Sequence, residues 1–357
     1  MSTKEVVQIE FSEVIKQDKS LFSKFEEAYG NEGIGALVVN NIPDFPQKRK
    51  RLLPYAQMLT KLDKDTLETL EAPELFYSNG WSHGREKFQG KPDLLKASYY
   101  ACPISDKFQM VYNEGDIRDC KNRWPEEGVL DGFEDAFKDL GRYINLVGIE
   151  IAKNLDKYIK ANCPKYQDGQ IEKHLRESTR TTGRLLHYFP VSEDIDITDM
   201  KWCGWHNDHG TLTGLCSAMY LDENFNEISP DTIEDDDSGL FAMTRNHEEV
   251  KIKIPQNSLA FQIGECSQIV SGGLLCATPH SVVSKPSTDG ISRNTFALFL
   301  EPNPFEDLKI PEGTDAGYVY KEDPTNQVPL MHNRWKEGYS FGKFEFKTFQ
   351  MYYENNK

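Results

Sequence analysis

Apolar residues at helical spacing dominate the first half of the chain. The clearest stretch is 131–161, where the apolar side chains fall on one stripe of a long helix. A shorter amphipathic helix is predicted over 18–29, with Asp18 as its N-cap and Gly30 as its stop signal. A third helical pattern begins at residue 48 and continues to about residue 70.

Short apolar runs separated by turn residues replace this pattern beyond about residue 182. They are RLLHYF, KWCGWH, TGLCSAMYL, GLFAMT, VKIKI, SLAFQI, QIVS, HSVVS and RNTFALFL. Such a series, with Gly, Pro, Asn and Asp between the runs, is typical of an antiparallel sandwich or barrel. In the first half, residues 5–10 and 36–39 are predicted strands, and residues 78–103 are predicted to be a loop. The fold class is therefore predicted to be α+β.

Three regions are expected on this basis. Residues 1–181 form a helix-rich N-terminal region, residues 182–305 the β core, and residues 306–357 an aromatic C-terminal extension that packs on the core. Within the core, residues 224–238 are an acidic insert without apolar spacing. Its simplest interpretation is a solvated loop between strands, and the alternative is an acidic metal-binding cluster.

Composition and charge narrow the class of protein and its partners. The chain has 357 residues, of which 38% are hydrophobic, which is sufficient for a packed core. Its formal net charge of -16 disfavours nucleic-acid and anionic-membrane partners, and the basic run 48–51 is interpreted as a solvated helix face.

The chain contains no recognisable leader and no stretch of roughly 20 apolar residues. Its seven cysteines form no CxxC pair, which argues against a disulfide framework or a thiolate zinc site. We therefore expect a reduced, cytoplasmic protein.

His206 and Asp208, in the run WCGWHNDHGTLT, are the first candidate metal ligands. On a strand, residues i and i+2 point to the same face, so an imidazole nitrogen and a carboxylate oxygen can reach one ion. A second histidine would complete a set of two His and one carboxylate. That set, with open coordination positions, is typical of mononuclear non-haem Fe(II) oxygenases.

The third ligand must come from a later histidine of the chain. His247 belongs to a second His-x-carboxylate triplet, but it follows an apparent hairpin tip and is interpreted as an exposed turn. His332 lies in a polar loop, whereas His280 enters a strand after a turn marked by Pro, so His280 is preferred. His209 has the opposite strand parity to His206, and we expect a structural role for it.

Arg293 and Thr295 are candidates for binding an acidic co-substrate. They again occupy positions i and i+2 of a predicted strand, in SRNTFALFL. A guanidinium beside a hydroxyl is a good receptor for a carboxylate, and a guanidinium in so apolar a strand requires an anionic partner. A dicarboxylate such as 2-oxoglutarate would place one carboxylate there and chelate the metal with its oxo-acid end.

Together these motifs resemble the isopenicillin N synthase-like branch of the 2-oxoglutarate/Fe(II)-dependent dioxygenases. The resemblance rests on WHNDHGTLT at 205–213, HSVV at 280–283 and RNTF at 293–296, with GIGALVVNNIP near the N-terminus. It extends from about residue 5 to about residue 305. It implies a double-stranded β-helix (jelly-roll) core, Fe(II) ligation by His206, Asp208 and His280, and 2-oxoglutarate binding by Arg293 and Thr295.

The sequence departs from the family pattern at three points. Thr295 stands where Ser is usual, which preserves the hydroxyl. Phe189 stands where many relatives carry a Tyr that contacts 2-oxoglutarate; the adjacent Tyr188 is the candidate for that contact, although strand alternation turns it to the other side from Phe189. The distance from His206 to His280 along the chain is longer than is typical, and the acidic insert accounts for it.

The expected activity is oxidation, most simply hydroxylation, of a small-molecule substrate by O2, with release of succinate and CO2. Fe(II) and 2-oxoglutarate are the expected cofactor and co-substrate, and ascorbate is a further candidate. No catalytic side chain is expected beyond the metal centre. Two alternatives stay open: an iron-dependent oxidase of this fold that does not use 2-oxoglutarate, and a non-catalytic jelly-roll binding protein.

Overall fold

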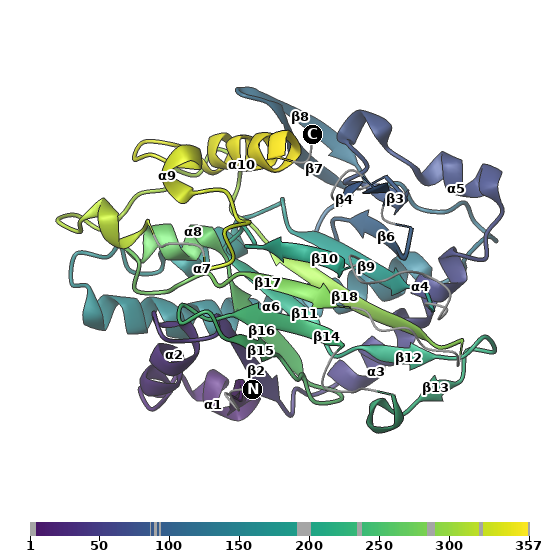
Figure 1. Ribbon diagram of the computed structural model, residues 1–357, viewed down its shortest axis with the longest axis horizontal. Coiled ribbons are helices and arrows are strands. Elements are labelled where there is room, and N and C mark those ends of the chain that lie inside the picture. The colour runs from purple at the N-terminus through teal and green to yellow at the C-terminus, as the bar shows by residue number, and fades with distance from the viewer. Residues whose placement is uncertain are drawn as a thin grey trace.

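The computed structural model describes residues 5–85, 87–88, 91–92, 94–190, 201–233, 238–283, 290–320 and 324–355. A large sheet lies at the centre of the molecule, and a smaller sheet faces it (Figure 1). The large sheet has the order β1 (Val7–Glu10), β2 (Ala36–Asn40), β16 (Leu259–Ile263), β11 (Leu212–Cys216), β18 (Ser292–Leu300), β9 (Thr182–Tyr188), β6 (Lys96–Ala101) and β3 (Gly80–His83). β12 (Met219–Leu221) and β13 (Glu227–Ile228) extend it beside β18.

The smaller sheet carries His206 and His280. Its order is β10 (Lys201–His206), β17 (His280–Val283), β14 (Gly239–Met243) and β15 (Glu249–Lys251), all antiparallel. Two hairpins lie outside both sheets. They are β4 (Lys87–Phe88) with β5 (Lys91–Pro92), and β7 (Lys107–Asn113) with β8 (Asp116–Lys121).

Helices cover the rest of the molecule. In chain order they are α1 (Phe11–Lys16), α2 (Leu21–Tyr29), α3 (Phe45–Leu52), α4 (Pro54–Leu59), α5 (Lys64–Leu70), α6 (Phe133–Asn162), α7 (Gln170–Arg176), α8 (Glu265–Val270), α9 (Met331–Arg334) and α10 (Phe341–Asn355). Single 3-10 turns occur at Pro73–Leu75, Pro230–Thr232 and Ala316–Tyr318. Among the described helices, none has the length and apolar character needed to cross a membrane.

The long helix α6 packs against β11 and β18 of the large sheet. Its apolar stripe is buried from Phe133 to Ile159, as its periodicity predicts. Two strand glycines let the helix approach closely. A Cβ at Gly214 would lie 2.5 Å from a methyl carbon of Ile144, and one at Gly183 would lie 2.8 Å from the Phe137 ring. The opposite face of the large sheet lines a cavity between the two sheets.

Several predicted elements are confirmed. The helix of residues 131–161 is α6, the helix of 18–29 is α2 with Gly30 at its C-cap, and the early strands are β1 and β2. The N-cap of α2 is Ser20, however, and Asp18 instead accepts a hydrogen bond from the Ser20 backbone nitrogen (2.9 Å). All the apolar runs beyond residue 182 contain strands except QIVS.

One predicted helical stretch is interrupted, and two other predictions of secondary structure were wrong. The helical stretch 48–70 is divided among α3, α4 and α5, because Pro54 starts a new helix and the Asp63 side chain caps another by accepting from the Thr66 backbone nitrogen (2.9 Å). The predicted loop 78–103 contains β3 and β6. The run QIVS belongs to α8, since a short buried apolar run has no period that separates helix from strand.

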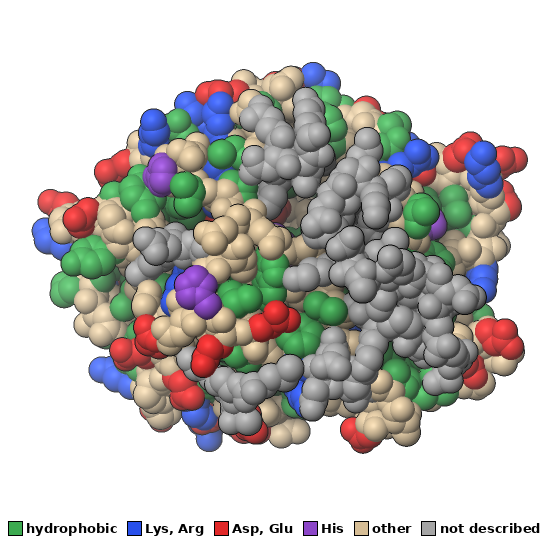
Figure 2. Space-filling view, viewed as in Figure 1, with side chains coloured by type: hydrophobic (Ala, Val, Ile, Leu, Met, Phe, Trp, Pro, Cys, Tyr) green, Lys and Arg blue, Asp and Glu red, His purple; other side chains and the backbone are tan. Residues whose placement is uncertain are grey.

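The acidic insert lies mostly at the surface in its described part. Residues 223–227 are exposed, and they lead through β13 into the 3-10 turn. The acidic run 234–237, the alternative metal-binding cluster, lies outside the described residues. Around the face shown in Figure 2, acidic and basic side chains are both distributed over the surface.

Candidate metal centre

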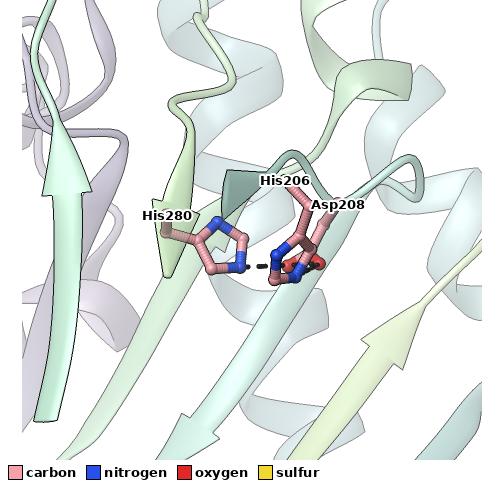
Figure 3. Close-up of side chains that lie close together, drawn as sticks. All are labelled: His206, Asp208 and His280. Carbon is pink, nitrogen blue, oxygen red and sulfur yellow. Dashed lines mark ion pairs between the residues drawn. The ribbon is translucent and has the colours of Figure 1, made fainter. Parts of the chain in front are cut away.

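His206, Asp208 and His280 lie together at one end of the smaller sheet. His206 ends β10 and is the direct partner of His280, which begins β17; Asp208 follows in the turn after β10. The Nε2 atom of each histidine lies 3.8 Å from Asp208 Oδ1, and the two imidazole rings are 4.2 Å apart (Figure 3). The structure thus brings the three predicted residues together, although Asp208 lies beyond the strand on which it was expected.

The three donor atoms suit a transition metal. All of them lie within 4.8 Å of one another. Bonds of roughly 2.1 Å allow two ligand atoms of one ion to lie up to about 4.2 Å apart, so the two distances of 3.8 Å fall within that span. Two imidazoles and one carboxylate on one side of an ion leave its other positions open.

Neighbouring groups orient each candidate ligand. His206 Nδ1 lies 2.8 Å from the Gly204 carbonyl, and an Nδ1 that donates there leaves the Nε2 lone pair directed at the metal position. His280 Nδ1 faces the Thr278 carbonyl at 3.4 Å in the same way. Thr213 Oγ1 donates to Asp208 Oδ2 (2.6 Å), which leaves Asp208 Oδ1 toward the histidines.

Burial and neighbouring charges set the protonation state of each candidate ligand. Burial lowers the pKa of His280 to about 4, so its imidazole is neutral at pH 7. Burial alone would raise the pKa of Asp208, but His280 and His206 hold it below its ordinary value. Burial opposes protonation of His206 too, yet the Cys203 sulfur and Asp208 raise its pKa to about 9. A metal ion would displace that proton.

The candidate co-substrate residues line the same cavity as the metal ligands. Arg293, Thr295 and Tyr188 all face it from the large sheet. Arg293 and Tyr188 are direct partners across β18 and β9, and the Arg293 guanidinium carbon lies 5.0 Å from the centre of the Tyr188 ring. The Thr295 hydroxyl donates to the Cys216 carbonyl (2.9 Å).

Tyr188 and Phe189 face opposite sides, as strand alternation predicts. The ring of Phe189 packs against His83 (5.1 Å) and His187 (4.5 Å), whereas Tyr188 lines the cavity. The aromatic ring beside Arg293 is therefore that of Tyr188, although Phe189 stands where many relatives carry the tyrosine.

The histidines that were set aside lie elsewhere. His247 has a φ of 60° in an exposed turn, and its Nδ1 lies 3.0 Å from the Pro324 carbonyl. His332 is exposed on α9. His209 turns away from the three ligands, toward Glu301 (3.4 Å) and Glu345 (3.6 Å), which agrees with a structural role.

Sequence reasoning missed several residues of the cavity wall. Lys96 and Arg184 line it from β6 and β9, and Thr213 lines it from β11. Lys96 lies in the segment that was predicted to be a loop, so no periodicity indicated its direction. Thr213 offered a weak signal, because it ends the run WHNDHGTLT, five residues after the candidate ligand Asp208. The apolar part of the wall includes Leu186, Leu215, Leu240, Val282 and Phe299.

Solved structures share this fold. A full-length Neurospora crassa protein in complex with alpha-KG has 21% identity and a TM-score of 0.66, covering 90% of this chain and 94% of its own. A putative 2OG-Fe(II) oxygenase family protein from Caulobacter crescentus has 18% identity and a TM-score of 0.67, covering 98% and 100%. The dioxygenase for auxin oxidation in rice has 14% identity and a TM-score of 0.58, covering 90% and 93%.

These likenesses establish that the chain has the fold of the 2OG-Fe(II) oxygenase structures. At the level of sequence, no protein-family model matches the chain, and a search of the curated proteins gives no match either.

Proposed function

We propose that this chain is an Fe(II)- and 2-oxoglutarate-dependent oxygenase that oxidises a small molecule. One observation carries the proposal: a cluster of two His and one Asp shares a cavity with an Arg–Tyr pair that can receive a carboxylate. The Neurospora crassa protein forms complexes with alpha-KG, and one of its structures also holds thymine, which supports a small-molecule substrate.

The finer assignments belong to the same proposal. The facing sheets are a jelly-roll core of the isopenicillin N synthase-like kind, with residues 182–305 as the oxygenase core. Residues 1–181 form the N-terminal region, and residues 306–357 form the C-terminal extension. The described helices α9 and α10 contact the core through Arg334 and Phe349, respectively.

The roles of the residues follow from their positions. His206, Asp208 and His280 would hold Fe(II), while Arg293 and Tyr188 would bind the far carboxylate of 2-oxoglutarate. When bound, Fe(II) and 2-oxoglutarate would activate O2, which is the oxidant, with conversion of 2-oxoglutarate to succinate and CO2. Thr295 lines the same pocket, and its hydroxyl would rotate away from the Cys216 carbonyl to donate to that carboxylate.

The apolar wall of the cavity excludes water from the reacting groups. Leu186, Leu215 and Phe299 lie among the cavity-lining residues, between strands that also carry the polar groups. Exclusion of water strengthens each electrostatic contact inside the site and protects a strong oxidant from side reactions. The protein thus contributes geometry and a dry pocket, and proton transfer by a separate acid or base is not required of it.

Anaerobic loading with Fe(II) and 2-oxoglutarate tests the proposal. We expect a visible metal-to-ligand charge-transfer band, and succinate that forms from 2-oxoglutarate when O2 and pooled metabolites are added. The D208A variant should lose both signals, whereas D119A, which changes an exposed residue of β8, should keep both.

The two alternatives give different results in the same experiment. Oxidation of a metabolite without succinate would identify an oxidase that does not use 2-oxoglutarate. Absence of both the band and the succinate from metal-loaded protein would favour the non-catalytic binding protein. Addition of ascorbate to the wild-type reaction tests whether it sustains turnover.

A further inference from the structure

The C-terminal helices contact the turn that carries Asp208. They provide none of the three candidate metal ligands. In Figure 1, α9 and α10 are coloured yellow, and α9 lies beside α8, to which Arg334 connects it. The N-terminus of α8 is bound directly to the metal-binding turn. The backbone nitrogen of Glu265 donates to the Asp208 carbonyl (2.8 Å), and that of Cys266 donates to the Gly210 carbonyl (3.0 Å).

The first connection runs from α9 to the residue before Asp208. Arg334 forms a bidentate ion pair with Glu265, with N–O distances of 2.6 and 2.7 Å, and both residues are only 1% exposed. Glu265 Oε1 also accepts a hydrogen bond from Asn207 Nδ2 (3.1 Å). Arg334 itself is held by the Pro329 carbonyl (2.9 Å). A chain of three side chains thus joins α9 to the position between His206 and Asp208.

The second connection runs from α10 to the residue after Asp208. The His209 ring stacks on Phe341, with ring centres 5.9 Å apart and planes 10° apart, and it meets Phe349 edge-on at 5.1 Å. Its Nε2 lies 3.6 Å from Glu345, which is fully buried. Both neighbours of Asp208 are therefore contacted by the C-terminal extension.

This network is better explained by positioning than by stability or by a second metal. A buried ion pair loses so much solvation that apolar replacements are often as stable, and fixing one geometry is its best-attested use. His209, Glu301 and Glu345 could surround an ion. The Arg180 guanidinium already provides the positive charge there, through its ion pair with Glu345 and its approach to Glu301 (4.0 Å).

We propose that α9 and α10 position the metal-binding turn, with Arg334 acting through Glu265 on Asn207 and α10 acting on His209. Arg334 and Phe349 are accordingly positioning residues for the Asp208 carboxylate. The inference rests on the proposed function in that it takes the cluster of His206, Asp208 and His280 to be a metal site. Loss of a group that bonds directly to a metal ligand typically changes metal affinity by about 10- to 100-fold. Arg334 acts on Asp208 through Glu265 and Asn207, so the lower end of that range is expected for the loss of the pair.

Cobalt(II) binding tests the inference without any need for turnover. The variants are R334K, which keeps the charge but loses the planar fork, the double variant R334M/E265M, which replaces the pair by apolar side chains, and F349A. Phe349 is 40% exposed, so its loss carries little risk to folding. We expect at least tenfold weaker Co(II) binding in the double variant, smaller losses in R334K and F349A, and an altered visible d–d spectrum at saturation in all three.

The control variant K343A changes another residue of α10, the helix that carries Phe349. Lys343 pairs with Glu114 (3.1 Å) at the surface, so wild-type Co(II) affinity and spectrum are expected. Thermal unfolding of each metal-free variant separates loss of fold from loss of position. If wild-type protein binds Co(II) and R334M/E265M and F349A match its affinity and spectrum, the inference is wrong while the metal site stands. If wild-type protein binds no Co(II), the proposed function fails and the inference fails with it.

Discussion

Asp208 divides its two carboxylate oxygens between the protein and the metal position. Oδ2 accepts the Thr213 hydroxyl at 2.6 Å, and Oδ1 lies 3.8 Å from each histidine. A carboxylate that is not held by a second group can rotate and present either oxygen. Thr213 therefore determines which oxygen a metal meets, although it makes no contact with the ion itself.

Replacing Thr213 by Val tests this role with little change of shape. We expect T213V to weaken Fe(II) or Co(II) binding by about 10- to 100-fold and T213S to restore most of the affinity, because the serine hydroxyl can donate to Asp208. Metal titration measures both effects. T211V is the matched control, since the buried Thr211 Oγ1 has no hydrogen-bond partner in the described part of the chain. Equal affinities for T213V and wild type would refute the assignment.

Arg293 lines the cavity beside Tyr188, and our proposal assigns it the far carboxylate of 2-oxoglutarate. R293M removes a charge-assisted contact worth about 1.5–3 kcal/mol, so half-saturation with 2-oxoglutarate should require roughly 10- to 100-fold more of it. Titration of the charge-transfer band measures this shift. R293K should recover only part of the loss, because an ammonium cannot form the bidentate contact. An unchanged 2-oxoglutarate titration in R293M would place the co-substrate elsewhere.

At the scale of elements, the approach of α6 to the large sheet depends on strand residues without a side chain. A Cβ at Gly183 would lie 2.7 Å from the Phe296 ring and 2.8 Å from the Phe137 ring. Both rings are buried and stiff, so neither can withdraw without disturbing its neighbours. The glycine therefore fixes the distance between the helix and the strand that carries Tyr188.

The G183A variant should lower the free energy of unfolding by about 1–3 kcal/mol through overpacking. Denaturant unfolding of the purified proteins measures the difference. G317A serves as a control, because a Cβ there would meet mainly the end of the Asp315 side chain, at 3.3 Å. A stability of G183A equal to that of G317A would mean that the rings rearrange freely.

At the scale of the whole molecule, buried histidines make stability depend on pH. His174 of α7 is 2% exposed, and burial lowers its pKa from 6.5 to about 4. Because the unfolded chain binds this proton more readily than the folded one, the stabilising contribution is complete above pH 6.5. It is lost as the pH falls toward 4.

Replacing His174 by Gln should remove this share of the pH dependence. Between pH 7 and pH 5, wild-type protein should lose about 2 kcal/mol more unfolding free energy than H174Q. Urea unfolding at the two pH values measures the difference, and H247Q, at an exposed turn, should behave like the wild type. Parallel losses in wild type and H174Q would show that His174 is protonated without cost in the folded state.

Local rules were sufficient for much of the fold and for the grouping of the candidate ligands. His206 and Asp208 meet as expected, but Asp208 lies in the turn after β10 and not on the strand. Strand alternation predicted that Arg293 and Thr295 face one side and that Tyr188 opposes Phe189. Each of these statements depends on residues within a few positions of one another, and the backbone geometry of a strand relates them directly. Amphipathic periodicity identified α6 for the same reason.

What the sequence did not determine depends on contacts between distant segments. Lys96 lines the cavity because β6 pairs with β9, and Arg334 reaches the metal-binding turn because α9 packs beside α8. QIVS belongs to α8, whose first residues, Glu265 and Cys266, donate backbone hydrogen bonds to the distant Asp208 and Gly210 carbonyls. The sequence by itself thus determined which residues could hold a metal and a carboxylate. Only the tertiary structure decided what surrounds and orients them, because those contacts depend on packing between segments far apart in the chain.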